Sequence, residues 1–334
     1  MRFGATILDA TGLRLTAQEK ALFRAVKPFG FILFARNIDT PDQVRALCDE
    51  MREAAGHDAV ITVDQEGGRV QRLRGPIWRD WTPPLDFVQA AGANAAQAMY
   101  IRYRLIAQEL HDVGIDSNCA PMVDVAGSQT HEFLRNRCYG TDAAQVAALG
   151  RAAADGMLAG GVLPVVKHMP GHGRATMDSH FDLPLVGAAH ADLATCDFAP
   201  FKALNDLPMG MTAHLVYDAI DPRPATLSPV MMQLIRDEIG FDNLIMTDDI
   251  SMKALQGGVD QISRDALEAG CDVILYCNAS LEDRSLVADA AGEMTDAAQT
   301  RAERALSMRV APDEIDISAL TAKLDALLGE ELHG

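Results

Sequence analysis

The chain has 334 residues, 49% of them hydrophobic, which is enough to bury a sizeable core in one large domain or two ordinary ones. Its formal net charge is -18 at pH 7, and such an acidic surface repels phosphate backbones and anionic lipid, so binding to nucleic acid or to a membrane is not expected. The six cysteines form no CxxC pair, and the sequence shows neither a secretory leader nor the ~20-residue apolar run of a membrane span, so we expect a cytoplasmic protein with free thiols.

Short apolar runs alternate with amphipathic stretches along the whole chain. The apolar runs predict β-strands at residues 5–8, 29–34, 59–63, 116–120, 163–166, 209–213, 244–246 and 273–276. Charged and apolar residues at helical spacing predict helices between them at 41–55, 93–113, 142–159, 229–239 and 263–269.

Eight strands that alternate with helices are typical of a (β/α)8 TIM-type barrel, an α/β fold that takes about 250 residues and grows by insertion. A doubly wound open sheet gives the same alternation, but it usually has a glycine-rich phosphate loop after its first strand. This chain has Asp9-Ala10-Thr11-Gly12 there, and no linker marks a domain boundary. We therefore predict a single barrel domain over residues 1–334, with a helical C-terminal extension from about residue 313.

Polar residues follow the predicted strands at the point where each strand ends. Asp64 follows the third strand, Lys167 and His168 the fifth, His214 the sixth and Asp248 the seventh. A barrel gathers its active-site groups at the carboxyl ends of its strands. The repetition therefore favours one shared site over five separate structural roles.

The segment Lys167–Gly173 is rich in polar groups, and Asp178 and His180 follow it closely. A carboxylate two residues from an imidazole can hold one ring nitrogen and raise the basicity of the other, so Asp178 can orient His180 as a proton donor and acceptor. The plainer alternative is a loop whose polar groups only satisfy its own backbone. A zinc site built from His168, His172 and His180 is a further alternative, but their spacing matches no common zinc signature, and no metal is expected.

Two more segments carry candidate binding and catalytic groups. In residues 64–72, Asp64 can accept hydrogen bonds from ligand hydroxyls and Arg72 can donate a charged fork, although the same residues would also suit a solvated turn. Asp248 comes directly after a strand and can act as a nucleophile, whereas Asp249 can instead cap a helix expected from Ser251 onward.

Taken in order along nearly the whole chain, these segments resemble glycoside hydrolase family 3, in its bacterial β-N-acetylhexosaminidase branch. The matching motifs lie at residues 63–72, 167–173, 178–180 and 247–252, with further similarity at 31–38, 136–139 and 225–229. Cys138 and Met169 depart from the family's usual serine and phenylalanine. The resemblance implies a (β/α)8 barrel and a retaining exo-β-N-acetylglucosaminidase that needs no cofactor.

The resemblance also implies a role for each matching residue. Asp248 would be the nucleophile and His180 the general acid/base, with Asp178 orienting that histidine. The hydroxyls of N-acetylglucosamine would be bound by Asp64, Arg72, Arg137, Lys167 and His168. The implied substrate is N-acetylglucosaminyl-anhydro-N-acetylmuramic acid, with or without its peptide, in cytoplasmic recycling of the cell wall.

Three other functions remain open on the sequence. The same scaffold could carry a β-glucosidase or another exo-glycosidase, and only a panel of substrates separates these. A non-catalytic sugar-binding protein could keep the binding residues, although intact Asp248 and His180 argue against it. A metal-dependent hydrolase is the last alternative.

Overall fold

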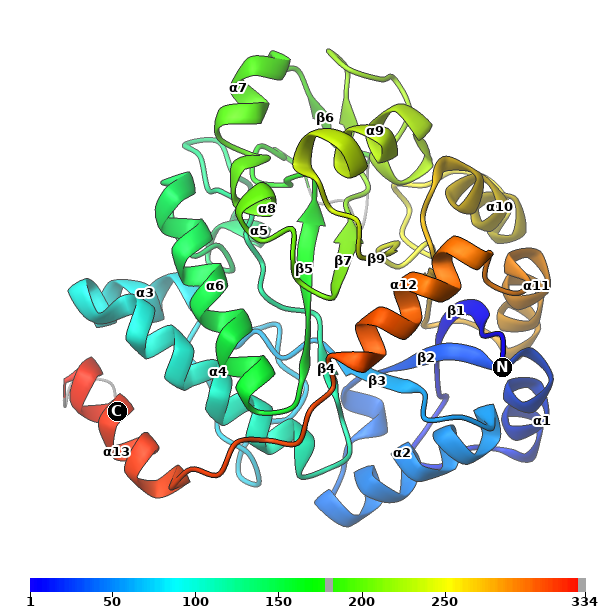
Figure 1. Cartoon of the computed structure of the whole chain (residues 1–334), viewed down its shortest axis with the longest axis horizontal. Coiled ribbons are helices and arrows are strands. Elements are labelled where there is room, and N and C mark those ends of the chain that lie inside the picture. The colour runs from blue at the N-terminus through cyan, green and yellow to red at the C-terminus, as the bar shows by residue number, and fades with distance from the viewer. Residues whose placement is uncertain (178–182, 330–334) are drawn as a thin grey trace.

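Parallel strands lie at the centre of the structure, and helices surround them (Figure 1). This computed structural model describes residues 1–177 and 183–329, so the predicted site residues Asp178 and His180 lie outside the described residues. The protein has an α/β fold, as the alternation of apolar runs and amphipathic stretches predicted.

The strands pair in parallel in two four-stranded sheets. The order of the first sheet is β10 (Ile274–Tyr276), β1 (Gly4–Asp9), β2 (Pro28–Leu33) and β3 (Val60–Val63). The order of the second sheet is β4 (Ser117–Asn118), β5 (Leu163–Met169), β7 (Met209–Thr212) and β9 (Leu244–Met246). A short parallel pair outside both sheets joins β6 (Leu185–Val186) to β8 (Val216–Tyr217). Each of the eight predicted strands overlaps a strand of the two larger sheets.

Backbone hydrogen bonds also connect the two sheets at both of their edges. Between β3 and β4, the N–H of Cys119 donates to the carbonyl of Val63 at 2.8 Å. Between β9 and β10, the N–H of Thr247 donates to the carbonyl of Val273 at 3.1 Å. Neighbouring strands therefore follow the order of the chain, and the described strands do not show the reversal of order that a doubly wound sheet requires.

The strands are apolar along most of their length because both of their faces are covered. Every residue of β1, β2 and β5 is buried, where a half-exposed sheet would alternate buried and exposed residues. Lys167 and His168 are polar exceptions, and both lie near the carboxyl end of β5. Burying a charged or polar side chain costs free energy unless it has a hydrogen-bond or ion-pair partner. The presence of both residues in a buried strand therefore indicates a functional site that supplies such partners.

The predicted helices are present, with one boundary to correct. They are α2 (Pro41–Ala55), α4 (Ala95–His111), α6 (Ala143–Ala159), α9 (Pro229–Leu234), which continues as a π-helical turn over Ile235–Ile239, and α10 (Val259–Ala269). The last of these begins four residues before the predicted residue 263. Its N-cap is Gly258, which has no side chain to mark a helix start in the sequence.

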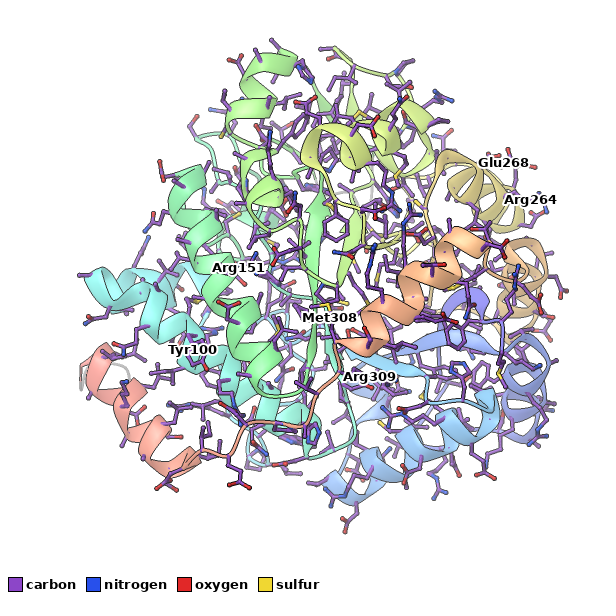
Figure 2. All side chains as sticks on the ribbon, in the orientation of Figure 1. Tyr100, Arg151, Arg264, Glu268, Met308 and Arg309 are labelled. Carbon is purple, nitrogen blue, oxygen red and sulfur yellow. The ribbon has the colours of Figure 1, made fainter. Side chains whose placement is uncertain are left out.

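Further helices complete the outer layer. They are α1 (Ala17–Val26), α3 (Pro84–Ala91), α5 (Glu132–Arg135), α7 (His190–Thr195), α8 (Ala199–Ala203), α11 (Leu281–Ala291), α12 (Asp296–Ser307) and α13 (Ile317–Leu328). The last is the helical extension predicted from about residue 313, and it packs against α3 and α4 with Leu324 buried. Side chains fill the space between these helices and the strands (Figure 2). Within the described part of the chain, no helix is both long and apolar enough to cross a membrane.

Candidate active site

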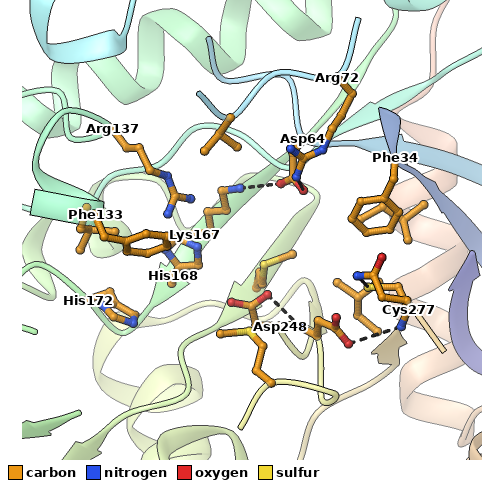
Figure 3. Close-up of a pocket in the computed structure, with 18 of the residues that line it drawn as sticks. Phe34, Asp64, Arg72, Phe133, Arg137, Lys167, His168, His172, Asp248 and Cys277 are labelled. Carbon is orange, nitrogen blue, oxygen red and sulfur yellow. Dashed lines mark hydrogen bonds and ion pairs between the residues drawn. The ribbon is translucent and has the colours of Figure 1, made fainter. Parts of the chain in front are cut away.

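A cavity of about 320 Å³ opens at the carboxyl ends of the strands (Figure 3). This volume lies within the range of small-molecule pockets. Six of the predicted site residues line it, and they are Asp64, Arg72, Arg137, Lys167, His168 and Asp248. They come from segments spread over nearly 200 positions of the chain. The carboxyl ends of β3, β5 and β9 bring Asp64, Lys167, His168 and Asp248 together, and loops add Arg72 and Arg137.

Asp64 joins two cations on one wall of the cavity. Its Oδ1 accepts a hydrogen bond from Lys167 Nζ at 2.9 Å, and its Oδ2 accepts one from an Arg72 guanidinium nitrogen at 3.0 Å. Burial would raise the pKa of Asp64, but Lys167 and Arg72 outweigh it and hold that pKa well below its ordinary value. Asp64 is therefore an ionised acceptor beside two donors, a set of groups suited to the hydroxyls of a sugar.

Glu66 is a member of this cluster that the sequence analysis did not single out. Both Arg137 nitrogens Nε and Nη2 donate to its carboxylate, at 2.9 and 2.8 Å, and Lys167 Nζ lies 2.6 Å from its Oε1. Glu66 is buried, and burial opposes its ionisation, but Arg137 and Lys167 lower its pKa to about 2. Glu66 thus fixes Arg137 and Lys167 relative to each other. Its position two residues after Asp64, on the same side of an extended chain, was the signal that could have found it.

We expect Glu66→Gln to lower the free energy of unfolding by about 3 kcal/mol at neutral pH, because it leaves buried cations without their carboxylate. The folded pKa of about 2 lies below the ordinary value of 4.5, so the stabilisation is complete above pH 4.5 and is lost as the pH falls toward 2. Urea unfolding of both proteins at pH 7, 4.5 and 3.5 measures this. The difference between them should shrink at pH 3.5, and a difference independent of pH would contradict the assignment. Glu53→Gln, on the exposed face of α2, controls for the loss of a charge.

Asp124 holds His168, and it too was missed in the sequence. Its Oδ2 lies 2.8 Å from His168 Nδ1, and its Oδ1 accepts the backbone N–H of His172 at 2.6 Å. Burial would raise the pKa of Asp124, but His168 and these hydrogen bonds lower it. Asp124 lies in the apolar run Pro121-Met122-Val123-Asp124-Val125, and nothing in that run marks it as a partner of a histidine 44 positions away.

Asp248 lies two residues after the end of β9, and its side chain faces the cavity. Its Oδ1 accepts the backbone N–H of Asp249 at 2.8 Å. Burial would raise the pKa of Asp248, but His168, His214 and that N–H outweigh it, so the pKa is lowered. The cavity therefore contains an ionised carboxylate, as a nucleophile requires. Among the described residues, Asp248 makes no ion pair as short as the 2.9 and 3.0 Å pairs that Asp64 makes with Lys167 and Arg72.

Asp249 does not cap a helix, and the helix expected from Ser251 is absent. The chain forms turns over residues 250–255 instead. Asp249 Oδ1 accepts the N–H of Ser251 at 3.0 Å and that of Cys277 at 3.3 Å. A hydrogen bond to the second residue onward closes an Asx turn, which competes with helix formation.

His214 lies behind the cavity rather than in its wall. It is buried, and its Nε2 lies 3.1 Å from the carbonyl of Asp249, which can only accept, so Nε2 carries a proton. Burial lowers the pKa of His214, and its Nδ1 lies 2.8 Å from the hydroxyl oxygen of Thr226, which itself donates to the Ala213 carbonyl. His214 thus supports the Asp248 segment through its backbone.

The cavity wall also has apolar side chains, among them Ile32, Phe34, Met211, Met252 and Leu275, together with further polar ones such as His172, Asp249 and Asn278. A lining that mixes polar and apolar groups suits a ligand with both hydroxyls and C–H faces. In residues 1–177 and 183–329, no three His, Cys, Asp or Glu side chains are grouped to hold a metal ion, and His180 of the zinc alternative lies outside that part.

Comparisons with known proteins agree on one family. Residues 7–308 match the family described as glycosyl hydrolase family 3 N terminal domain. A β-hexosaminidase of Alkalilimnicola ehrlichii is 36% identical over 83% of this chain and 82% of its own length. A β-hexosaminidase of Pseudomonas aeruginosa is 38% identical over 82% of each chain.

Solved structures agree with these relatives. A glycoside hydrolase family 3 β-N-acetylglucosaminidase from Paenibacillus sp. str. FPU-7 superposes with a TM-score of 0.85 at 29% identity, over 97% of this chain and 67% of that one. NagZ from Neisseria gonorrhoeae, in complex with N-trifluoroacetyl-D-glucosamine, superposes with a TM-score of 0.81 at 27% identity, over 98% of this chain and 99% of that one. Both likenesses extend over nearly all of the chain.

Proposed function

The chain belongs to glycosyl hydrolase family 3 and is a glycosidase of the β-hexosaminidase type, and we propose that it removes terminal β-linked N-acetylglucosamine with retention of configuration. The observation that carries the proposal is the cavity itself. It combines the ionised Asp248 with a cluster of sugar-binding groups around Asp64 and Lys167. The β-hexosaminidase relatives, and the solved relative that binds an N-acylated glucosamine, support the same sugar.

We infer that the eight strands of the two sheets form one closed (β/α)8 barrel in a single domain. The support is the hydrogen bonding between β3 and β4 and between β9 and β10, which joins both edges of the two sheets. The order of strands also follows the chain, as in a barrel. A barrel would place every catalytic and binding group at one rim.

Hydrolysis would proceed by two displacements at the anomeric carbon. Cleavage passes through an oxocarbenium-like state, which needs an anion on one side and a proton for the leaving oxygen. Asp248 attacks C1 while His180 gives its proton to the departing oxygen, so the C1–O bond to the aglycone breaks as the C1–O bond to Asp248 forms. His180 then takes a proton from a water molecule whose oxygen attacks C1, so a new C1–O bond forms as the C1–O bond to Asp248 breaks and the sugar is released. Two inversions leave the β configuration unchanged.

The sugar would be held mainly by its hydroxyls. Asp64 is the acceptor, and Lys167, Arg72 and Arg137 are donors fixed in place by Asp64 and Glu66. His168 would meet a further hydroxyl, and Asp178 would orient His180. No cofactor takes part in this proposal.

The natural substrate we propose is N-acetylglucosaminyl-anhydro-N-acetylmuramic acid, with or without its peptide. Its support is the likeness of the motifs at residues 63–72, 167–173 and 178–180 to the bacterial branch of the family, together with bacterial relatives such as that of Pseudomonas aeruginosa. This substrate places the reaction in the cytoplasm, in recycling of the cell wall.

Turnover of aryl glycosides by the purified protein tests the function. We expect kcat/KM for an aryl N-acetyl-β-glucosaminide to exceed that for the aryl β-glucoside by at least ~100-fold. The reason is that a substrate without the N-acetyl group would leave buried polar groups of the protein without hydrogen-bond partners. Proton NMR of the first product should show the β anomer. A faster β-glucoside would make the protein a β-glucosidase, and an α anomer would make it inverting. Sugar binding without turnover would make it a binding protein, and loss of activity with a chelator would favour a metal-dependent hydrolase.

A further inference from the structure

The two carboxylate oxygens of Asp124 contact a side chain and the backbone. Asp124 is fully buried on the segment that follows β4. Its Oδ2 lies 2.8 Å from the Nδ1 of His168, a side chain that lines the cavity. Its Oδ1 accepts the backbone N–H of His172, in the loop after β5, at 2.6 Å and that of His168 at 3.4 Å.

The hydrogen bonds locate a proton on the His168 ring. An ionised carboxylate can only accept, and the pKa of Asp124 is lowered in spite of burial, by His168 among other groups. Nδ1 must therefore donate, and it carries a proton. Because Nδ1 faces the buried Asp124 while His168 lines the cavity, the ring presents its other nitrogen, Nε2, to the cavity.

We propose that Asp124 is a positioning residue for the reaction: it keeps a proton on His168 Nδ1, fixes the ring so that Nε2 faces the sugar, and anchors the loop after β5 through the His172 N–H. This inference rests on the proposed function only for the group that Nε2 contacts, which is a hydroxyl of the sugar. The location of the proton does not depend on it.

The anchored loop has further fixed points that Asp124 does not provide. The Thr130 hydroxyl donates to the Gly173 carbonyl at 2.5 Å, and the Tyr217 hydroxyl donates to the Gly171 carbonyl. A Cβ on Gly173 would lie only 1.9 Å from the Val125 carbonyl oxygen. The loop therefore packs closely against the segment that carries Asp124, and only glycine leaves room for this contact. Because these contacts remain when Asp124 is changed, the loop and the histidine ring can be tested separately.

Asp124→Asn separates the two contacts. The amide oxygen can still accept the His172 N–H, but the amide nitrogen then faces His168 Nδ1 as a donor, so the ring must give up its Nδ1 proton and carry one on Nε2. The ring proton therefore shows whether the carboxylate fixes the tautomer of His168. A change in kcat/KM that accompanies the switch of tautomer shows that this tautomer matters for the reaction.

The experiment is a long-range proton–nitrogen NMR spectrum of the protein labelled with ¹⁵N-histidine at pH 8, with the His168 signals assigned by their loss in His168→Asn. We expect a protonated Nδ1 in the wild type and a bare Nδ1 in Asp124→Asn. We also expect kcat/KM on the aryl N-acetyl-β-glucosaminide to fall 10- to 100-fold in that variant, the range seen for partners that orient a histidine ligand. Thermal melting confirms that the variant is folded.

Asp197→Asn is the matched control, because Asp197 is also a buried carboxylate beside this loop but pairs with Arg174, 2.7 Å away. It should leave the His168 signals unchanged. A bare Nδ1 in the wild type, an Nδ1 proton that persists in Asp124→Asn, or a switched tautomer with unchanged kcat/KM would each overturn the proposal. If the wild type hydrolyses no N-acetylglucosaminide, the proposed function fails, and the spectra still show where the proton lies.

Discussion

Asp248→Ala is expected to lower kcat on an aryl N-acetyl-β-glucosaminide by at least about 10⁴-fold, the order of loss seen when a nucleophile or its partners are removed. The reason is that the covalent intermediate can no longer form, while the proton donor and the sugar-binding cluster remain. Steady-state rates of both proteins measure the loss. An unchanged rate would remove the nucleophile assignment.

Two measurements make this prediction specific to residue 248. Azide can enter the space left by the side chain and attack C1 from the same face, so Asp248→Ala with azide should yield the α-glycosyl azide. In the wild type, a 2-fluoro glycoside with a good leaving group should leave a sugar attached to Asp248, which peptide mass mapping locates. Asp249→Asn is the matched control: its side chain is occupied by Ser251 and Cys277, and we expect its loss to stay within about 10-fold.

The strands of this fold could be predicted from the sequence because burial on both faces makes them apolar over their whole length. All eight predicted strands overlap strands of the two sheets. Several helices were missed, although α1 has a capping box in which Thr16 and Glu19 cap each other's backbone, a pattern visible in the sequence. The helix expected from Ser251 failed because the Asp249 side chain closes a turn there.

The candidate site could be predicted where its residues lie within two residues of the carboxyl end of a strand, as Asp64, Lys167 and Asp248 do. Asp124 could not, because its importance lies in a contact with His168, 44 positions away, which leaves no local pattern of spacing. Glu66 contacts Lys167, 101 positions away, and only its spacing of two residues from Asp64 pointed to it. His214 shows the opposite error. Its position after a predicted strand grouped it with the site residues, but it contacts the backbone of Asp249 and does not line the cavity.

His180→Ala is expected to slow hydrolysis most for substrates whose leaving group needs a proton in order to depart. For a phenyl N-acetyl-β-glucosaminide we expect kcat/KM to fall by about 10²- to 10⁴-fold, the usual contribution of a general acid. For the 2,4-dinitrophenyl glycoside, whose phenolate leaves unaided, the first step should slow by less than about 10-fold. Its second step should become slow, because no base activates water, and a burst of dinitrophenolate should precede the steady state. His190→Ala, at an exposed histidine on α7, is the control.

Azide then separates the two catalytic roles by stereochemistry. In His180→Ala the covalent intermediate on Asp248 still forms, so azide attacks it from the opposite face and should yield the β-glycosyl azide, where Asp248→Ala yields the α anomer. A histidine with only a structural role would give equal losses on both aryl glycosides and no rescue by azide. Opposite anomers from the two variants would place the carboxylate of residue 248 below the sugar ring and the imidazole of residue 180 beside the scissile oxygen, the arrangement that retention requires.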